Sequence, residues 1–455
     1  MIKNAYYKVS ILIFFLITLL ISNIYVNKFE NQIFTSSSYS YSSIFHEDTI
    51  LYFSSTDKIS EDQANGKNFL TSGDSYKRSF LYPRIIYVFN KFFNDGEIIL
   101  NNETQEVNFK NYKSFIFIQL FFFYLSILFL HFSLSKLINL KFANITSIVL
   151  CINPILMQWH LTMLTESIFL SFLIITFGFL INSKKNIQFF FIGLLIGILY
   201  MLRTISLLYP IIFIFFILCL KENILNKTSK FIYLIFGFSI ILFLIGSHNY
   251  KRAGIFYFTP IQSKTDLQTY LEPSILSKSQ NLTQGEISIY FENRKKEILN
   301  NNNFDLKSEK GEINFFNEIR NKSFENIYEN KLITAKIVLK NYFHSTLLNP
   351  VQVYYASKYK DWIDYKNSKH HSFWLKIRIV FTLLFFIFTG LGFLFSFKKI
   401  DLKFNVFIIF SCLYFFGVGC WLGNTRYFTP SVLFMNVYFS IFLNQVYLKF
   451  SRKIN

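Results

Sequence analysis

Cysteine is scarce in this chain, which has four cysteines among 455 residues. All four lie within long apolar runs, and none belongs to a Cys-x-x-Cys pair; they are Cys151, Cys219, Cys412 and Cys420. Because disulfide frameworks and zinc sites need cysteines at close or regular spacing, the sequence predicts neither. A glycine-rich phosphate loop is also missing, so a nucleotide is not expected as the donor of a transferred group.

Acidic residues are few as well, since 27 Asp and Glu stand against 46 Lys and Arg, a formal net charge of +19. Such an excess suggests a nucleic-acid partner, but its placement indicates a membrane protein. The two ends of the chain and alternate short loops hold Lys3, Lys8, Lys136, Lys141, Lys184, Lys185, Lys221, Lys227, Lys230, Lys398, Lys399, Lys403, Lys449, Arg452 and Lys453. The same segments hold only two acids, Glu222 and Asp401. We therefore expect contacts with membrane lipids, no nucleic acid, and both termini in the cytoplasm.

Long apolar runs dominate the chain, in which 52% of residues are hydrophobic and 60 are Phe. Runs close to the length that crosses a bilayer cover residues 9–26, 113–133, 143–159, 163–181, 187–202, 205–220, 230–247, 374–396, 404–422 and 427–447. No small-residue cleavage site follows the first run, which we interpret as a retained anchor. Since backbone in lipid must bond internally, the sequence predicts an all-α integral membrane protein with about ten transmembrane helices.

Two long polar segments interrupt these runs, and the charge pattern places both outside the cytoplasm. The predicted organisation is a transmembrane module at 1–247 with a first outer loop at 27–112, an outer helical domain at 248–373, and a three-helix transmembrane segment at 374–455. Phe80–Phe93 is typical of a helix lying in the membrane interface. Gly193 and Gly197, spaced four apart, predict close helix packing.

Ionisable residues are rare within the apolar runs. Glu166, Arg203 and Arg426 lie at the ends of runs that the charge pattern directs outward, on the same side as Asp48. Charges at membrane depth usually face a cavity or a partner, which predicts a shared polar cavity opening outward. Alternatively, each of these three side chains at the ends of the runs simply extends its charged group into the lipid head-group layer and has no functional role.

Several short motifs occur in an order that matches this topology. They are Asp48-x-x-x-Tyr52, Gly73-Asp74-Ser75-Tyr76-Lys77-Arg78, Leu81-Tyr82-Pro83, Leu164-Thr165-Glu166-Ser167, Leu202-Arg203-Thr204, Asn249-Tyr250, Phe258-Thr259-Pro260 and Arg426-Tyr427-Phe428-Thr429-Pro430. Together they resemble the GT-C glycosyltransferases, in particular the aminoarabinose lipid A transferases and the protein O-mannosyltransferases. The resemblance covers roughly residues 1–260 and the last span, whereas 261–373 match no pattern.

The resemblance implies a transferase that moves a sugar from a polyprenyl-phosphate donor to a lipid, glycan or protein acceptor outside the cytoplasm, with inversion at the anomeric carbon. The implied catalytic base is Asp48, with Glu47 and then Asp74 as alternatives. Residues expected to contact the phosphate or donor are Arg203, Arg426, Tyr427, Tyr52, Lys77, Arg78 and Arg84. Glu166 and Asn249 are expected to support them.

Three questions stay open at this level. Asp48, Glu47 and Glu166 have the carboxylate oxygens that Mg²⁺ or Mn²⁺ prefers, but no spacing requires a metal. An O-antigen-type polymerase would place functional basic residues in 248–373, and a lipid-linked sugar flippase would need a polar path through the midplane. The abundance of Asn and Lys indicates an AT-rich genome, which favours a bacterial inner membrane as the location.

Overall fold

The computed structural model of the protein describes residues 12, 15–20, 22–23, 47–69, 72–73, 79–97, 99, 109–260, 262–347, 369–419, 421 and 425–454. All regular structure in these residues is helical, which confirms the predicted class. The elements are α2 (Glu47–Ala64), α3 (Leu81–Phe93), α4 (Tyr112–Leu137), α5 (Leu140–Ile152), α6 (Pro154–His160), α7 (Thr165–Asn182), α8 (Asn186–Leu202), η1 (Thr204–Ser206), α9 (Pro210–Leu218), α10 (Ile224–Ala253), α11 (Gln262–Asp266), η2 (Leu267–Leu271), α12 (Glu272–Ser279), α13 (Gln284–Asn302), α14 (Glu309–Glu329), α15 (Lys331–Leu347), α17 (Lys369–Ser396), α18 (Leu402–Gly419), η6 (Thr425–Tyr427) and α19 (Thr429–Ile454).

Within the described residues, six helices are long and apolar enough to cross a membrane, namely α4, α7, α10, α17, α18 and α19. Shorter apolar helices cover Leu140–Ile152, Asn186–Leu202 and Thr204–Leu218. The run predicted at 143–159 is divided into α5 and α6, because Pro154 cannot donate the backbone bond that would continue α5. The protein is thus a multi-pass integral membrane protein, and the total of ten spans remains a prediction.

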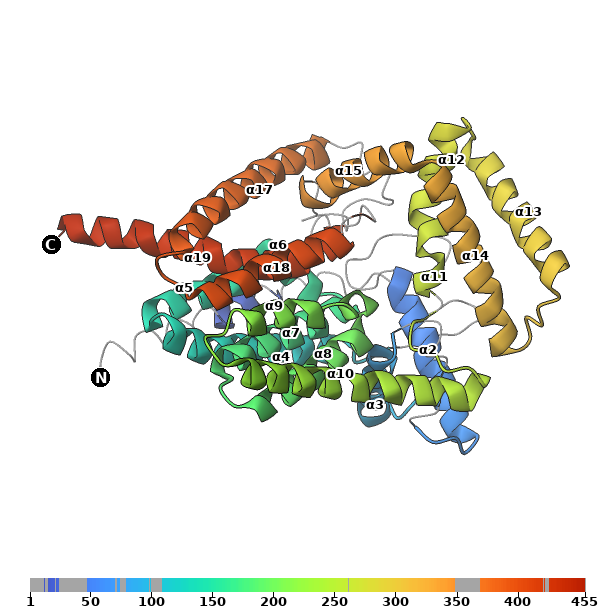
Figure 1. Ribbon diagram of the computed structural model, residues 1–455, viewed down its shortest axis with the longest axis horizontal. Helices are drawn as coiled ribbons and strands as arrows, with labels where there is room; N and C mark the ends of the chain where they lie inside the picture. The colour runs from blue at the N-terminus through green and yellow to red at the C-terminus, as the bar shows by residue number, and fades with distance from the viewer. Residues whose placement is uncertain are drawn as a thin grey trace.

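The polar segments gather at one end of the helical bundle. Figure 1 shows α2 and the helices α11–α14 on the right-hand side of the molecule, where the end of α10 also lies, whereas the C-terminal end of α19 points to the opposite side. Helix α15 leads back to the bundle, where Tyr342 Oη donates to the Gly417 carbonyl at 2.7 Å. This arrangement puts both predicted outer segments on the same side of the predicted membrane.

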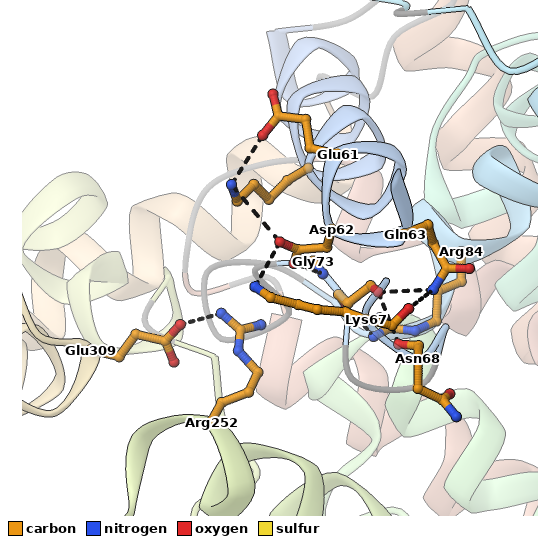
Figure 2. A network of polar contacts seen from close by, with 11 residues as sticks. Glu61, Asp62, Gln63, Lys67, Asn68, Gly73, Arg84, Arg252 and Glu309 are labelled. Carbon is orange, nitrogen blue, oxygen red and sulfur yellow. Dashed lines mark hydrogen bonds and ion pairs between the residues drawn. The ribbon is translucent and has the colours of Figure 1, made fainter. Parts of the chain in front are cut away.

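The first outer segment is held together by buried carboxylates. Asp62 Oδ1 accepts from Lys67 Nζ at 2.8 Å, and its Oδ2 accepts from the Gly73 amide at 2.9 Å (Figure 2). Burial opposes ionisation of this carboxyl, but these two bonds hold the pKa of Asp62 below its ordinary value. Asp57 Oδ1 accepts from the Ile99 amide at 2.8 Å. All three bonds tie α2 to the chain that follows it.

Glycines set the spacing between α8 and α10. A Cβ added at Gly193 would lie 2.1 Å from the Leu234 carbonyl oxygen, and one at Gly237 would lie 2.2 Å from the Phe190 carbonyl oxygen. At Gly197 an added Cβ would meet the Ile241 side chain at 2.5 Å. The close packing predicted from Gly193 and Gly197 is therefore confirmed, because the two helix backbones meet where side chains are missing.

Replacing Gly193 by Leu is expected to lower the free energy of unfolding by about 3 kcal/mol, since the new side chain collides with backbone that cannot move alone. Gly390→Leu in α17 is the matched control, because nothing lies within 4 Å of its Cβ position. Unfolding would be followed in lipid bicelles. Equal stability of the two variants would contradict the close crossing of α8 and α10.

The outer domain, α11–α15, contains a buried ion pair in place of a large apolar core. Glu272 at the start of α12 is fully buried, and both its oxygens bind the Arg294 guanidinium, with Nη2 at 2.9 Å from Oε2. Ser323 Oγ donates to Oε2 at 2.8 Å, and Asn326 Nδ2 donates to Oε1 at 2.9 Å. One carboxylate thereby connects α12, α13 and α14.

Glu272→Gln should destabilise the outer domain by about 3–5 kcal/mol, because the Arg294 charge would stay buried without its counter-charge. Glu292→Gln is the control, since Glu292 is exposed on α13 and pairs with the exposed Lys295. Limited proteolysis of α11–α15 as a function of denaturant measures the difference. Similar protease resistance in both variants would show that the buried network is dispensable.

Candidate active site

Four charged residues from distant parts of the chain meet at the end of the bundle that the sequence predicts to face outward. Asp48 lies in the first turn of α2 and Glu166 in the first turn of α7. Arg203 is the residue that ends α8, and Arg426 lies in the short helix η6 just before α19. A carboxylate at a helix N-terminus is favoured by the helix dipole, which accounts for the positions of both acids.

Glu166 is the centre of the cluster. Its Oε1 atom lies 3.0 Å from Arg203 Nη1 and 2.8 Å from Arg426 Nε. Arg426 Nη1 also forms an ion pair with Asp48 Oδ2. Only 1% of the Glu166 side chain and 6% of each arginine side chain is exposed, whereas 16% of the Asp48 side chain is exposed. The ion pairs compensate three buried charges, and Asp48 lies at the more open side of the cluster.

The arginines are further held by aromatic rings. The guanidinium carbon of Arg203 lies 4.8 Å from the centre of the Tyr427 ring, and that of Arg426 lies 5.4 Å from the same ring. Tyr52, one turn after Asp48, packs edge-on against Tyr82 at 5.0 Å between ring centres. Tyr427 and Tyr52, both expected at the donor site, are therefore part of this cluster's surroundings.

A cavity of about 270 Å³ opens beside the arginines. Its lining comprises Tyr52, Ser79, Thr165, Leu202, Arg203, Thr204, Ile205, Leu207, Thr259, Pro260, Asp266, Val418, Trp421, Arg426 and Tyr427. Thr259 and Pro260 belong to a motif that carried the family resemblance, although no role was expected for either. The lining thus joins the first outer segment, the two arginine-bearing turns and the outer domain.

Asp266 and Trp421 are cavity residues that sequence reasoning missed. Asp266 ends α11, in the segment that matches no family pattern, and it precedes a single π-helical turn, η2. Trp421 is held through its carbonyl, which accepts from Asn341 Nδ2 of α15 at 2.8 Å. No pattern in the sequence marks either residue. Asp266 reaches the arginines only because the domain of α11–α15 folds over the bundle, whereas Trp421 shortly precedes Arg426 but belongs to no motif.

The pKa shifts of two groups outside the spans, Arg426 and Tyr270, agree with the closeness of these charges. Burial alone would lower the pKa of Arg426, but Glu166 and Asp48 raise it well above its ordinary value. Burial, with smaller contributions from Tyr427 and Asp48, raises the pKa of Tyr270 to about 12. Arg426 therefore stays charged, and η2, which contains Tyr270, lies within electrostatic reach of the cluster.

Other predicted site residues lie elsewhere or outside the described part. Arg84 Nη1 donates to the Phe80 carbonyl at 2.9 Å and its Nη2 to the Ser72 carbonyl at 2.8 Å, so the guanidinium binds backbone of its own segment. Asn249 Nδ2 donates to the Tyr257 carbonyl at 2.8 Å, which fixes the end of α10. Asp74, Lys77 and Arg78 lie outside the described residues, as does the side chain of Glu47.

The cluster does not fit a divalent cation in its present arrangement. Asp48 and Glu166 have the oxygens that such an ion prefers, but Arg426 lies between them and contacts both. Glu166 Oε2 also accepts from Thr165 Oγ1 at 3.2 Å. In the described part of the chain, no group of three or more His, Cys, Asp or Glu side chains has the geometry to hold a metal.

Comparison with known proteins gives a match of fold. No protein-family model and no curated protein matches the sequence. The archaeal oligosaccharyltransferase AglB from Archaeoglobus fulgidus, solved with an inhibitory peptide and a dolichol-phosphate, is 12% identical with a TM-score of 0.51, over 97% of this chain and 51% of that one. The Archaeoglobus fulgidus oligosaccharyltransferase tethered with an acceptor peptide through a disulfide bond is 13% identical with a TM-score of 0.49, over 96% and 50%.

The chain therefore shares the fold of the archaeal oligosaccharyltransferase AglB over 97% of its length, which agrees with the architecture that the sequence predicts. It spans about half the length of the solved structures that it matches. At this identity the likeness concerns the fold alone.

The central role of Glu166 can be tested by a double-mutant cycle with Arg203. Glu166→Gln alone is expected to cost about 3–5 kcal/mol, because two guanidiniums would be left close together with half of their compensation. Adding Arg203→Met should restore part of that loss, since one uncompensated charge is removed. Thermal unfolding in detergent measures each variant, and strictly additive losses would contradict the shared carboxylate.

Proposed function

We propose that this protein is a glycosyltransferase that moves a sugar from a polyprenyl-phosphate-linked donor to a lipid, glycan or protein acceptor on the non-cytoplasmic face. The observation that carries the proposal is the pairing of two buried arginines with an acidic residue at the outer end of a GT-C bundle. The predicted orientation, with both termini in the cytoplasm and the protein in a bacterial inner membrane, is part of the proposal.

The donor's phosphate is the ligand that the arginines suit. Each guanidinium carries five N–H donors in a planar fork, a shape that suits the oxygens of a phosphate. Preformed donors aimed at a leaving group stabilise the negative charge that develops as its bond breaks. Arg203 and Arg426 would hold the phosphate, and Glu166 would fix the orientation of both arginines.

The reaction needs one proton acceptor, for which Asp48 is the candidate. The acceptor's O–H or N–H proton passes to Asp48 as its heavy atom forms a bond with the anomeric carbon. The bond from that carbon to the phosphate oxygen breaks, and its electron pair stays on the polyprenyl phosphate. Attack opposite the leaving group inverts the anomeric configuration. A carboxylate has enough lone pairs to keep the contact with Arg426 while it accepts the proton.

The fold neighbour supports the substrate class. The Archaeoglobus fulgidus structure contains a dolichol-phosphate and a peptide, which are a polyprenyl-type phosphate and a protein-type ligand. The cavity beside the arginines has aromatic rings in Tyr52, Tyr427 and Trp421 and a carboxylate in Asp266. Aromatic faces and carboxylates are suited to the apolar faces and hydroxyl groups of a sugar, so we assign the sugar to this cavity.

The alternatives fit the contacts less well. An O-antigen-type polymerase would use basic residues of the late outer loop, yet Arg294 is bound to Glu272 and Arg252 is paired with Glu309. A flippase would need charges that mark a path to the opposite face, whereas the four clustered charges lie at one end of the bundle. Neither alternative uses Asp48.

Asp48→Asn is expected to lower sugar transfer by about 10²–10⁴-fold, because the amide cannot take the proton. Transfer would be measured with purified protein in lipid, a panel of radiolabelled polyprenyl-phosphate sugars and crude membrane acceptors. Asp95→Asn is the matched control, since Asp95 is exposed at a left-handed turn of the same outer segment and Asn tolerates that backbone. Wild-type rates in the Asp48 variant would move the base to Glu47 or Asp74.

A further inference from the structure

The two carboxylates of the cluster are bridged by a guanidinium. Arg426 contacts Asp48 through Nη1 and Glu166 through Nε, with the latter pair at 2.8 Å. A guanidinium is planar and its nitrogens point in different directions, so it can contact two carboxylates at once, as a bridging metal ion does. This bridge draws together α2 and α7, which lie far apart in the sequence.

We propose that Arg426 takes the place of a divalent cation in this site, so that phosphate binding and sugar transfer require no Mg²⁺ or Mn²⁺. The inference rests on the proposed function for the transfer step, but its structural part concerns only the cluster. The proposal answers the question, left open by the sequence, of whether the carboxylates of Asp48 and Glu166 bind a divalent cation.

Charge balance supports the exchange of a metal for arginine. Glu166 and Asp48 contribute two negative charges, and Arg203 and Arg426 contribute two positive charges. A divalent ion added here would lie beside two buried guanidiniums and would be repelled by both, because screening is weak in a buried site. The carboxylates are already neutralised, so little attraction remains to offset that repulsion.

The contacts of Glu166 also disfavour a metal. Its Oε1 is shared by the two arginines, and its Oε2 accepts from Thr165 Oγ1 at 3.2 Å. A metal would have to displace at least one of these contacts and leave a guanidinium buried without its partner, which is costly. Asp266 lines the adjoining cavity, but it belongs to no metal-binding group in the described part of the chain.

The first test measures Mn²⁺ binding by electron paramagnetic resonance, with the full chain in lipid nanodiscs. The wild type is expected to bind no more Mn²⁺ than the Asp48→Asn variant. A tightly bound ion in the wild type that is lost in Asp48→Asn would overturn the proposal. This result does not depend on any activity of the protein.

The Arg426→Asp variant gives the converse measurement. Replacing the guanidinium by a third carboxylate should create a site for about one Mn²⁺ per chain, since oxygen ligands would then surround the vacated position. Adding Asp48→Asn should remove that site again. A folded Arg426→Asp protein that gains no Mn²⁺ would show that the guanidinium is not at a cation position. If the variant does not fold, the wild-type comparison decides.

The second test is sugar transfer after treatment with EDTA. The wild-type rate should stay within about twofold of the rate with added Mg²⁺ or Mn²⁺. Loss of transfer on chelation that Mg²⁺ or Mn²⁺ restores would overturn the proposal. If no donor supports transfer with or without metal, the proposed function fails, while the Mn²⁺ measurement still decides the role of Arg426.

Discussion

The shared carboxylate of Glu166 is the contact on which the arginine-bearing end of this bundle depends. Two guanidiniums approach the same oxygen, at 2.8 and 3.0 Å, in a place with almost no exposure to solvent. Buried charges of like sign can lie this close only when a counter-charge compensates them. The start of α7 therefore fixes the end of α8 and the start of α19, and through Arg426 it fixes α2 as well.

The spans supply the rigid frame for this contact. Gly193 and Gly237 let α8 and α10 approach closely, which positions the turn that carries Arg203. The outer domain then approaches from the other side, with Asn341 of α15 bonded to the Trp421 carbonyl and Asp266 at the cavity lining. A cavity built from several rigid elements suits the proposed lipid-borne donor, whose apolar tail would remain in the membrane.

Much of this architecture could be predicted from the sequence. Apolar runs predicted the helical membrane class, which the structure confirms. The motif order predicted a GT-C-like fold, and the fold match to an archaeal oligosaccharyltransferase agrees with it. The site was predicted as a set of charges at one end of the spans. The contacts within it could not be predicted, because ion pairs such as Asp48–Arg426 join residues hundreds of positions apart. Asp266 escaped prediction because the segment that holds it has no recognisable motif.

The sequence by itself determined the membrane class, the expected orientation and the choice of charged residues, since these follow from composition and local pattern. Only the tertiary structure decided how those charges compensate one another. From the sequence alone, the carboxylates of Asp48 and Glu166 are compatible with a metal site or with an arginine site. The difference lies in which cation reaches their oxygens. Here the helix ends bring Arg426 between Asp48 and Glu166, because burying the arginine is favourable only where both acids can pair with it.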